Sequence, residues 1–399
     1  MRERSSRGWG TRRWAPVAGL CAVGIVACGG GPGDAASGAR ADSAGVVVWT
    51  DPGSDRAPDF RLVRTGSFAQ PDTGWALSPD GIAVDREGGR IYVLDESTPR
   101  VLVFDTDGAL LGERGRAGEG PGEYLAPTAL DVGSGGLVGV MDPEAGGVHR
   151  WARDGSYAGR DPMPIPYWGP GFAVIPDGMV YTTAGGEETG TMTEALVRLS
   201  GAGADTLFAV TSRWTPLEMP CGRVPVPEVL ARSSVWAGAG DRVVYASVPR
   251  YELRVLSAGA LETVYRRAVP PRAVSAAEAE ATVAAGPLSF LVEACGMTAS
   301  GVVRGAGFVD EVSPIVHLAM GPAGRVWAVR GLGAALTAID VFDPEGGYLG
   351  TITPDDPAVG GSVGGLPIPA VFVDSGHFVA IAESEWGRAL EFWQVEGGS

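Results

Sequence analysis

The sequence predicts an all-β fold in which one short antiparallel sheet is repeated six times. Three observations favour this fold class. The 399 residues include 62 Gly and 30 Pro, a content typical of many turns between short strands. With 45% hydrophobic and 20% charged residues, the chain can bury a large core. Segments with alternating apolar residues recur between the turns, as half-buried strands require.

The clearest copies of the repeat lie near the two ends of the chain. Residues 89–93 (GRIYV) and 103–112 (VFDTDGALLG) are echoed by 324–328 (GRVWA) and 341–350 (VFDPEGGYLG). In both copies an Asp-Gly or Glu-Gly pair marks a hairpin between the last two strands. Weaker copies begin at Gly136, Gly178, Asp241 and Gly376. An apolar strand precedes each copy, at residues 82–84, 129–130, 172–174, 234–236, 316–318 and 371–373.

Such sheets are too small to bury both of their faces alone, but radial stacking buries them. The sequence therefore predicts a six-bladed β-propeller of four-stranded antiparallel blades over residues 46–399. The last repeat offers only three strands, at 370–373, 377–382 and 390–395. We expect residues 60–64 or 46–49 to supply the missing outer strand, because an N-terminal strand there would close the ring and remove an exposed edge.

The first repeat resembles a known repeat family. Residues 79–105 resemble the NHL repeat of six-bladed propellers, and residues 115–124 (GRAGEGPGEY) resemble its glycine-rich connection. As a whole, the chain is similar to bacterial six-bladed β-propeller lipoproteins. This resemblance implies a protein of the cell envelope and implies no particular activity.

The N-terminal segment indicates export. An Arg-rich start and a short apolar run predict a signal peptide over residues 1–27, and Ile25-Val26-Ala27-Cys28 resembles the bacterial lipobox. We therefore expect lipidation of Cys28, a flexible tether over residues 28–45, and anchoring in the cell envelope facing the periplasm. Gly29 favours the outer membrane over the inner one. The alternative is an ordinary signal peptide with an incidental Cys.

The charge composition excludes several functions. The formal net charge is −16, all 31 basic residues are Arg, and the sequence contains neither Lys nor Asn. Because it lacks a basic surface, we expect no binding of nucleic acid, and we expect membrane contact only through the lipid anchor. Schiff-base chemistry on a lysine is excluded.

Two of the spacings between repeats are long and indicate insertions, which we expect to lie on the same face of the propeller. They cover about residues 212–231 and 266–313, and they contain Cys221 and Cys295, for which we predict a disulfide. The alternative is two separate buried thiols. Ser275-Ala276-Ala277-Glu278 is a capping box, which predicts a helix that runs to Ala285. This helix, with residues 288–292, either covers a binding site beside the channel or packs over a blade edge.

Candidate site residues lie on the innermost strands. Asp85, Asp131 and Asp374 could ring a channel mouth and hold a structural Ca²⁺, and His317 could line the channel. The alternatives are acids that form turns and a structural histidine. Gluconolactonase- and paraoxonase-like propellers hold their metal partly with Asn, and quinone-dependent ones surround their cofactor with Lys and Asn. Because this chain has neither residue type, we predict no cofactor.

These observations favour a binding or assembly module over an enzyme. We expect a protein or small-molecule partner on the face that carries the insertions. The alternative is a propeller hydrolase or lyase that acts at the channel mouth through these Asp residues and His317. A third possibility is a purely structural envelope protein.

Overall fold

The computed structural model describes residues 38–68, 81–95, 97–163, 171–187, 190–201, 203–231, 234–246, 250–321, 323–332, 335–345, 347–353, 359–360, 369–384 and 387–397. The predicted signal peptide, Cys28 and residues 28–37 of the tether lie outside the described residues. All described residues belong to the unit Gly38–Ser399.

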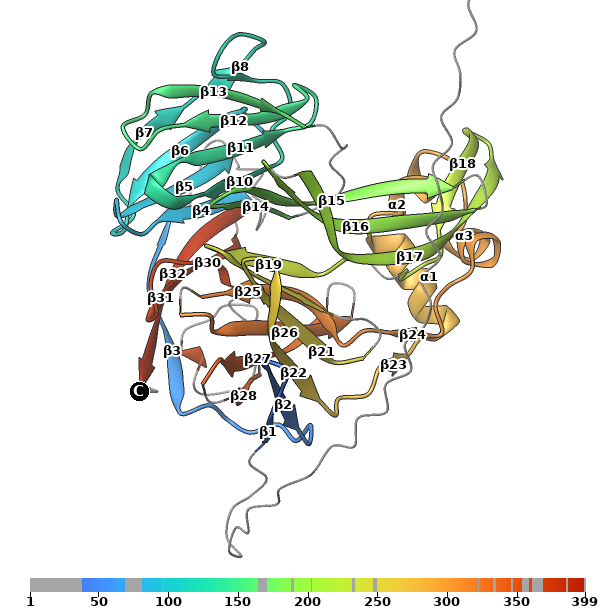
Figure 1. Ribbon diagram of the computed structural model, residues 1–399. Coiled ribbons are helices and arrows are strands. Elements are labelled where there is room, and N and C mark those ends of the chain that lie inside the picture. Colours follow the sequence, from blue (N-terminus) through green and yellow to red (C-terminus); the bar gives the residue numbers. More distant parts are fainter. Residues whose placement is uncertain are drawn as a thin grey trace, which may run out of the picture. The chain divides into compact units, whose positions relative to one another are not determined.

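The chain is all-β, and most of its strands pair antiparallel with the next strand in sequence (Figure 1). The first sheet contains β4 (Ile82–Asp85), β5 (Arg90–Asp95), β6 (Arg100–Asp105) and β7 (Leu110–Arg114). The second contains β10 (Ala129–Val132), β11 (Val138–Asp142), β12 (Gly147–Trp151) and β13 (Tyr157–Pro162). The third contains β14 (Phe172–Ile175), β15 (Gly178–Glu187), β16 (Thr191–Ser200), β17 (Gly203–Met219) and β18 (Gly222–Pro227).

Three further sheets follow along the chain. The fourth contains β19 (Trp236–Ala239), β20 (Arg242–Ala246), β21 (Glu252–Ser257) and β22 (Ala260–Arg267). The fifth contains β25 (Ile315–Met320), β26 (Val326–Leu332), β27 (Ala335–Asp343) and β28 (Gly347–Ile352). The sixth contains β30 (Pro369–Phe372), β31 (His377–Ser384) and β32 (Gly387–Gly397). Two small pairs complete the set: β8 (Arg116–Ala117) with β9 (Glu123–Tyr124), and β23 (Arg272–Ala273) with β24 (Glu311–Val312).

The strands follow the repeat seen in the sequence. In the first sheet, the alternating residues of β5 are buried on both faces, because each sheet packs between two others. The hairpin between β6 and β7 turns at the predicted Asp-Gly pair. There Asp105 Oδ1 accepts a hydrogen bond from the Ala109 amide (2.8 Å), and Gly108 adopts a φ of +86° that favours glycine.

The innermost strands are neighbours in sequence order. Contacts link β4 to β10, β10 to β14, β14 to β19, β19 to β25, and β25 to β30, and β30 in turn contacts β4. Hydrophobic clusters fill the spaces between the sheets, and large buried side chains such as Trp327 and Trp393 contribute to them. The six innermost strands therefore surround a common central space.

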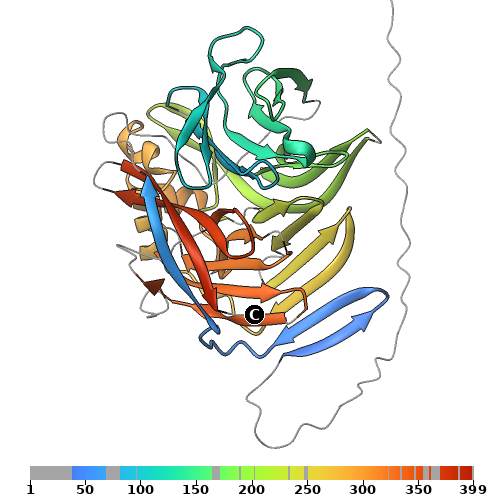
Figure 2. The ribbon, with the colours of Figure 1, turned by 90° about the vertical axis from the view of Figure 1, so that its left-hand side faces the viewer.

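Two N-terminal strands each pair with a strand that is distant in sequence. Strand β3 (Phe60–Phe68) pairs antiparallel with β32 and supplies the outer strand of the sixth sheet, which β29 (Val359–Gly360) extends. Figure 2 shows β3 in blue beside the red β32. Strand β2 (Val46–Asp51) instead pairs parallel with β22 in the fourth sheet. Of the two segments that could have filled the outer position, residues 60–64 occupy it.

Part of the expected tether is a strand. Strand β1 (Ala39–Ser43) forms a hairpin with β2, and the turn between them uses positive φ angles at Ala44 and Gly45. Pairing with β2 gives this polar segment backbone hydrogen bonds that its composition alone does not indicate.

The insertions form a structure of their own on the third sheet. The second insertion contains α1 (Ala276–Ala285), α2 (Ser289–Glu293) and α3 (Ala299–Ala306). The predicted capping box of Ser275 and Glu278 is present at α1, whereas α2 and α3 were not predicted. Among the described residues, no helix is both long enough and apolar enough to cross a membrane.

Candidate site in the central cavity

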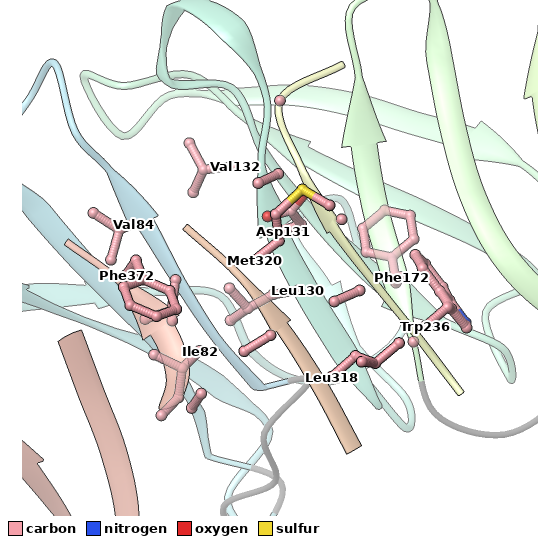
Figure 3. Close-up of a pocket in the computed structure, with 18 of the residues that line it drawn as sticks. Ile82, Val84, Leu130, Asp131, Val132, Phe172, Trp236, Leu318, Met320 and Phe372 are labelled. Atoms are coloured by element: carbon pink, nitrogen blue, oxygen red, sulfur yellow. The ribbon is translucent and has the colours of Figure 1, made fainter. Parts of the chain in front are cut away.

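A cavity of about 110 Å³ lies among the innermost strands. Each of the six innermost strands contributes lining residues, and Figure 3 shows the labelled side chains converging from these strands. An innermost strand has a neighbour on one side only, so part of its backbone N–H and C=O groups faces this space. The cavity wall therefore combines aliphatic and aromatic side chains with polar backbone.

Asp131 brings a carboxylate to this wall. It lies on β10, and its Oδ2 accepts a hydrogen bond from the Val174 amide of β14 (2.7 Å). Burial is the largest influence on this group and raises the pKa of Asp131 to about 6. The amides of Val174 and Val132 and the nearby charge of Arg86 oppose this rise without cancelling it. Asp131 thus changes charge close to neutral pH.

Arg86 brings a positive charge to the same wall. It follows β4 directly and lines the cavity, and its Nη2 donates to the Phe372 carbonyl of the sixth sheet (2.9 Å). Burial lowers the pKa of Arg86, while the charges of Asp131 and Asp374 act in the opposite direction. A guanidinium remains protonated in proteins, so Arg86 is a fixed donor here. The sequence-based prediction did not include this residue, although its position after an innermost strand was a usable signal.

His317 adds a hydrogen-bond acceptor, because the N–H of its neutral ring donates to the Pro369 carbonyl. It lies on β25 beside a register shift that separates it from Ile315, and it lines the cavity. Burial lowers the pKa of His317, and a hydrogen bond to the Pro369 backbone only partly offsets this. Its Nε2 has no hydrogen-bond partner among the described residues. The prediction that His317 faces the channel therefore agrees with the cavity lining.

Asp85 and Asp374 do not join Asp131. Asp85 is 3% exposed, and it accepts from Arg153 Nη2 of the second sheet (2.8 Å) and from the Gly88 amide (3.0 Å). Asp374 lies in the turn before β31 and is not part of the cavity wall. Partial burial favours its protonation, but hydrogen bonds from Gly376 and His377 outweigh this and lower the pKa of Asp374. The expected ring of three carboxylates does not form, because two of the acids are held by turns and ion pairs.

The three carboxylates that were expected to hold Ca²⁺ are therefore not grouped around one point. Within the part of the chain that the structure describes, no three His, Cys, Asp or Glu side chains are grouped closely enough to hold a metal ion. The donor set also lacks Asn, because the chain contains none. These residues do not fit the metal site that lactonase-like propellers use.

The other two histidines serve the structure. His149, on β12, is 2% exposed, and its Nδ1 lies 3.2 Å from the Tyr157 hydroxyl, while its ring meets Tyr124 edge to face. It packs between elements and does not face solvent. His377 Nδ1 forms a hydrogen bond with Asp374 Oδ1 (2.9 Å) in the turn before β31.

The insertions lie away from the central cavity. Their helices pack with β17 and β18 around the buried Val283, Leu291 and Val302, and Figure 1 shows them beside these strands. None of the described residues that line the cavity comes from α1, α2 or α3. Of the two roles considered for the helix, packing over the edge of a sheet fits the contacts and a lid over the channel does not.

Cys221 and Cys295 lie together within this insertion structure. A disulfide joins Cys221, in the turn between β17 and β18, to Cys295 after α2, and their Cα atoms are 5.0 Å apart. The bond links the first insertion to the second, 74 residues apart in sequence. It fastens the extended β17–β18 hairpin to the helices.

A buried ionic cluster was also missed by the sequence-based prediction. Arg267 is 4% exposed, and its Nε donates to Asp51 Oδ1 of β2 (2.9 Å). Its Nη1 lies 2.9 Å from Oδ2 of the fully buried Asp340, and its guanidinium stacks 3.9 Å from the Tyr348 ring centre. Charged residues on otherwise apolar strands were the available signal. The cluster joins the N-terminal segment to the fourth and fifth sheets.

Comparison with known proteins supports the fold. Residues 82–157 match a family model that is described as a 6-bladed beta-propeller. The pentonolactonase XacC of Haloferax volcanii is 29% identical over 178 residues, which are 42% of this chain. The match spans 59% of the length of that relative. The chain is thus an all-β protein with a segment characteristic of six-bladed propellers.

Several solved structures have a similar chain path at low identity. The superposition with a candidate exported protein of Bacteroides fragilis spans 88% of this chain and 99% of that protein, at 11% sequence identity and a TM-score of 0.49. The gluconolactonase XC5397 of Xanthomonas campestris covers 91% with 98% of its own, at 14% identity and a TM-score of 0.43. The PQQ-bound aldose sugar dehydrogenase of Streptomyces coelicolor covers 86% with 100% of its own, at 14% identity and a TM-score of 0.44.

Proposed function

We propose that this protein is an exported binding module that takes a small polar ligand into its central cavity. In this proposal the six blades form a ring that strand β3 closes, and a lipid on Cys28 holds the domain in the envelope. The observation that carries the ligand site is that Asp131, Arg86 and His317 line one cavity shared by all six innermost strands. A cavity with a few convergent polar groups is the usual form of a small-molecule site.

The three side chains define the ligand chemistry. Arg86 can only donate hydrogen bonds, and ionised Asp131 can only accept them. The ring N–H of neutral His317 donates to the Pro369 carbonyl, so its Nε2 can only accept. Opposite charges on the wall disfavour a ligand with a strong net charge of its own. The cavity of about 110 Å³ has room for several water molecules, so a small neutral molecule with hydroxyl and carbonyl groups fits it.

A hydrolase that opens a lactone is the second candidate. It is favoured by the 29% identity to a pentonolactonase and by the pKa of Asp131 at about 6, which suits a general base near neutral pH. In such a reaction Asp131 would take a proton from water as the water attacks the lactone carbonyl, and Arg86 would face the developing negative charge. The acyl C–O bond of the ring would then break, and protonated Asp131 would return its proton to the leaving ring oxygen. A metal-dependent route finds no matching ligand set among the described residues.

One titration separates the two candidates. The purified domain is mixed with a pentonolactone and with the open-chain acid, binding is followed by NMR, and ring opening is followed by release of acid. Binding without ring opening supports the module, whereas ring opening that Asp131→Asn abolishes supports the hydrolase. Asp107→Asn, an exposed turn acid on the first sheet, is the control. Failure to bind the lactone and other small neutral polyols would contradict a polar ligand site.

The envelope location rests on the sequence of the first 29 residues. The signal peptide over 1–27, the lipobox and Gly29 favour a lipoprotein of the outer membrane, and the NHL-like first repeat is consistent with that group. Expression of the full chain with a labelled fatty acid should label the protein, and Cys28→Ser should abolish the label and release the protein from membranes. A labelled Cys28→Ser variant would place the acyl group elsewhere.

A further inference from the structure

A second cavity, of about 260 Å³, lies between the third and fourth sheets. It opens beside the hairpin turns β14–β15, β19–β20 and β21–β22. The central cavity lies along the innermost strands and shares no lining residue with it. Its lining residues are Ile175, Pro176, Asp177, Val180, Arg198, Leu207, Asp241, Val243, Leu256, Ala258 and Gly259.

The space exists because the packing between these sheets is thin. The buried cluster here consists of Ala173, Ile175, Val180, Leu196 and Val243, and it is the one described cluster between neighbouring sheets that buries no aromatic ring completely. Two partly buried aromatic residues also pack between these sheets, but neither of them lines the cavity. Phe208 packs on Tyr245, with ring centres 4.8 Å apart, and Trp236 Nε1 donates to Thr182 Oγ1 (2.9 Å). Aliphatic side chains are left to line an unfilled space.

The rim of this cavity is acidic. Asp177 and Asp241 are exposed in the β14–β15 and β19–β20 turns, and no described residue forms an ion pair with either of them. Arg198 also lines the cavity, but its charge is already matched. Its Nη2 donates to Asp205 Oδ2 (2.8 Å), and its Nη1 donates to the Ala258 carbonyl (3.2 Å). Two carboxylates therefore remain without a cation at the opening.

We propose that this cavity binds small amphiphilic cations, with the apolar part inside and an ammonium group at the rim facing Asp177 and Asp241. A dry cavity of about 150 Å³ can hold a benzene molecule, so one of about 260 Å³ can hold a phenylethyl or short alkyl group. The chain's formal net charge of −16 attracts cations to its surface and adds to the local preference. This site is independent of the proposed ligand site around Asp131.

Three probes with a common body test the proposal. The domain is titrated with 2-phenylethylammonium, 2-phenylethanol and phenylacetate at pH 7, and the methyl NMR signals of Val180, Val243 and Leu256 are followed. We expect the ammonium probe to bind about fivefold to tenfold more tightly than the alcohol and the carboxylate to bind most weakly. Added salt should reduce the advantage of the ammonium probe, because the carboxylates are exposed.

Variants separate the two parts of the site. Asp177→Asn with Asp241→Asn should remove the preference for the ammonium probe and leave binding of the alcohol unchanged. Glu144→Gln, at an exposed turn acid of the second sheet, is the matched control. It should change neither the preference for the ammonium probe nor the binding of the alcohol. Leu207→Trp should fill the cavity and weaken all three probes. If this variant does not fold, the Asp177→Asn and Asp241→Asn substitutions still test the proposal, because these two side chains lie on the surface.

Two outcomes would overturn the proposal. One is that no probe shifts these methyl signals up to about 10 mM, which is weaker than any useful affinity. The other is that the three probes bind equally well and the double Asn variant makes no difference. Asp131→Asn should leave the titration unchanged, so failure of the central site and failure of this one remain distinguishable.

Discussion

Asp131 shows how a single carboxyl group can be tuned by its place in the fold. Its neighbours on β10 are apolar, and the group that it accepts from, the Val174 amide, belongs to the next sheet. Burial raises its pKa from 3.8 to about 6 in the folded state. Between these two values the folded protein holds a proton that the unfolded chain has already released. Stability therefore falls as the pH rises through this window.

Asp131→Asn removes that dependence. The neutral amide still accepts from Val174, so we expect the variant to be more stable than the parent protein at pH 7 by about 1–3 kcal/mol and to match it near pH 4. Urea unfolding at a series of pH values between 4 and 8 measures the difference. Asp107→Asn should show no comparable change. A variant that is less stable at pH 7 would mean that the ionised carboxylate stabilises the fold.

The pKa shift of His317 makes stability depend on pH in the opposite direction. Burial lowers the pKa of His317, so the folded protein resists protonation that the unfolded chain accepts. Its contribution therefore reduces stability as the pH falls below the ordinary value of 6.5. Near pH 6 the cavity wall therefore carries a neutral imidazole at His317 and a partly protonated carboxyl group at Asp131.

Among the elements, the β17–β18 hairpin and the three helices stand out because they extend the third sheet. Met219 and Val226 of the hairpin are buried against Val283 and Leu291 of the helices. The Cys221–Cys295 bond fastens the two insertions at one point. Cross-linking ends that are 74 residues apart also restricts the unfolded chain, which contributes about 4 kcal/mol in the chain-entropy model.

The disulfide predicts the outcome of thiol labelling. A domain of residues 38–399, which lacks Cys21 and Cys28, is unfolded in denaturant without a reductant. It should take up no thiol reagent, and after reduction it should take up two equivalents. Cys221→Ser with Cys295→Ser should unfold at a lower urea concentration, with a loss of about 2–4 kcal/mol. Labelling of both residues before reduction would show that they are separate thiols.

For the whole molecule, the N-terminal strands connect parts that are far apart in the chain. Strand β3 pairs with β32, and Phe60 and Leu62 are buried in the cluster that includes Trp327 and Trp393. Strand β2 adds to the fourth sheet, where Asp51 meets the buried Arg267. Removal of one partner from such a buried ion pair is strongly destabilising, since it leaves the other charge without compensation.

Comparison of two leucines on outer strands tests the contribution of β3 to the free energy of unfolding. Leu62→Ala should lower the free energy of unfolding by about 2–4 kcal/mol, because Leu62 is 1% exposed between the fifth and sixth sheets. Leu110→Ala, on the outer strand β7 and 55% exposed, should change it by less than about 0.5 kcal/mol. Urea unfolding measures both. Equal effects of the two substitutions would show that β3 contributes little to the fold.

The sequence by itself determined the strand repeat, the helix at Ser275, and the placement of His317 on an innermost strand, because each depends on local periodicity, capping or turn chemistry. Only the tertiary structure decided which N-terminal segment lies beside β32, where the helices pack, and which acids share a wall. Asp85, Asp131 and Asp374 look alike in sequence, yet Arg153 binds the first and a turn holds the third. Contacts between distant residues made those distinctions, and a local pattern carries no information about them.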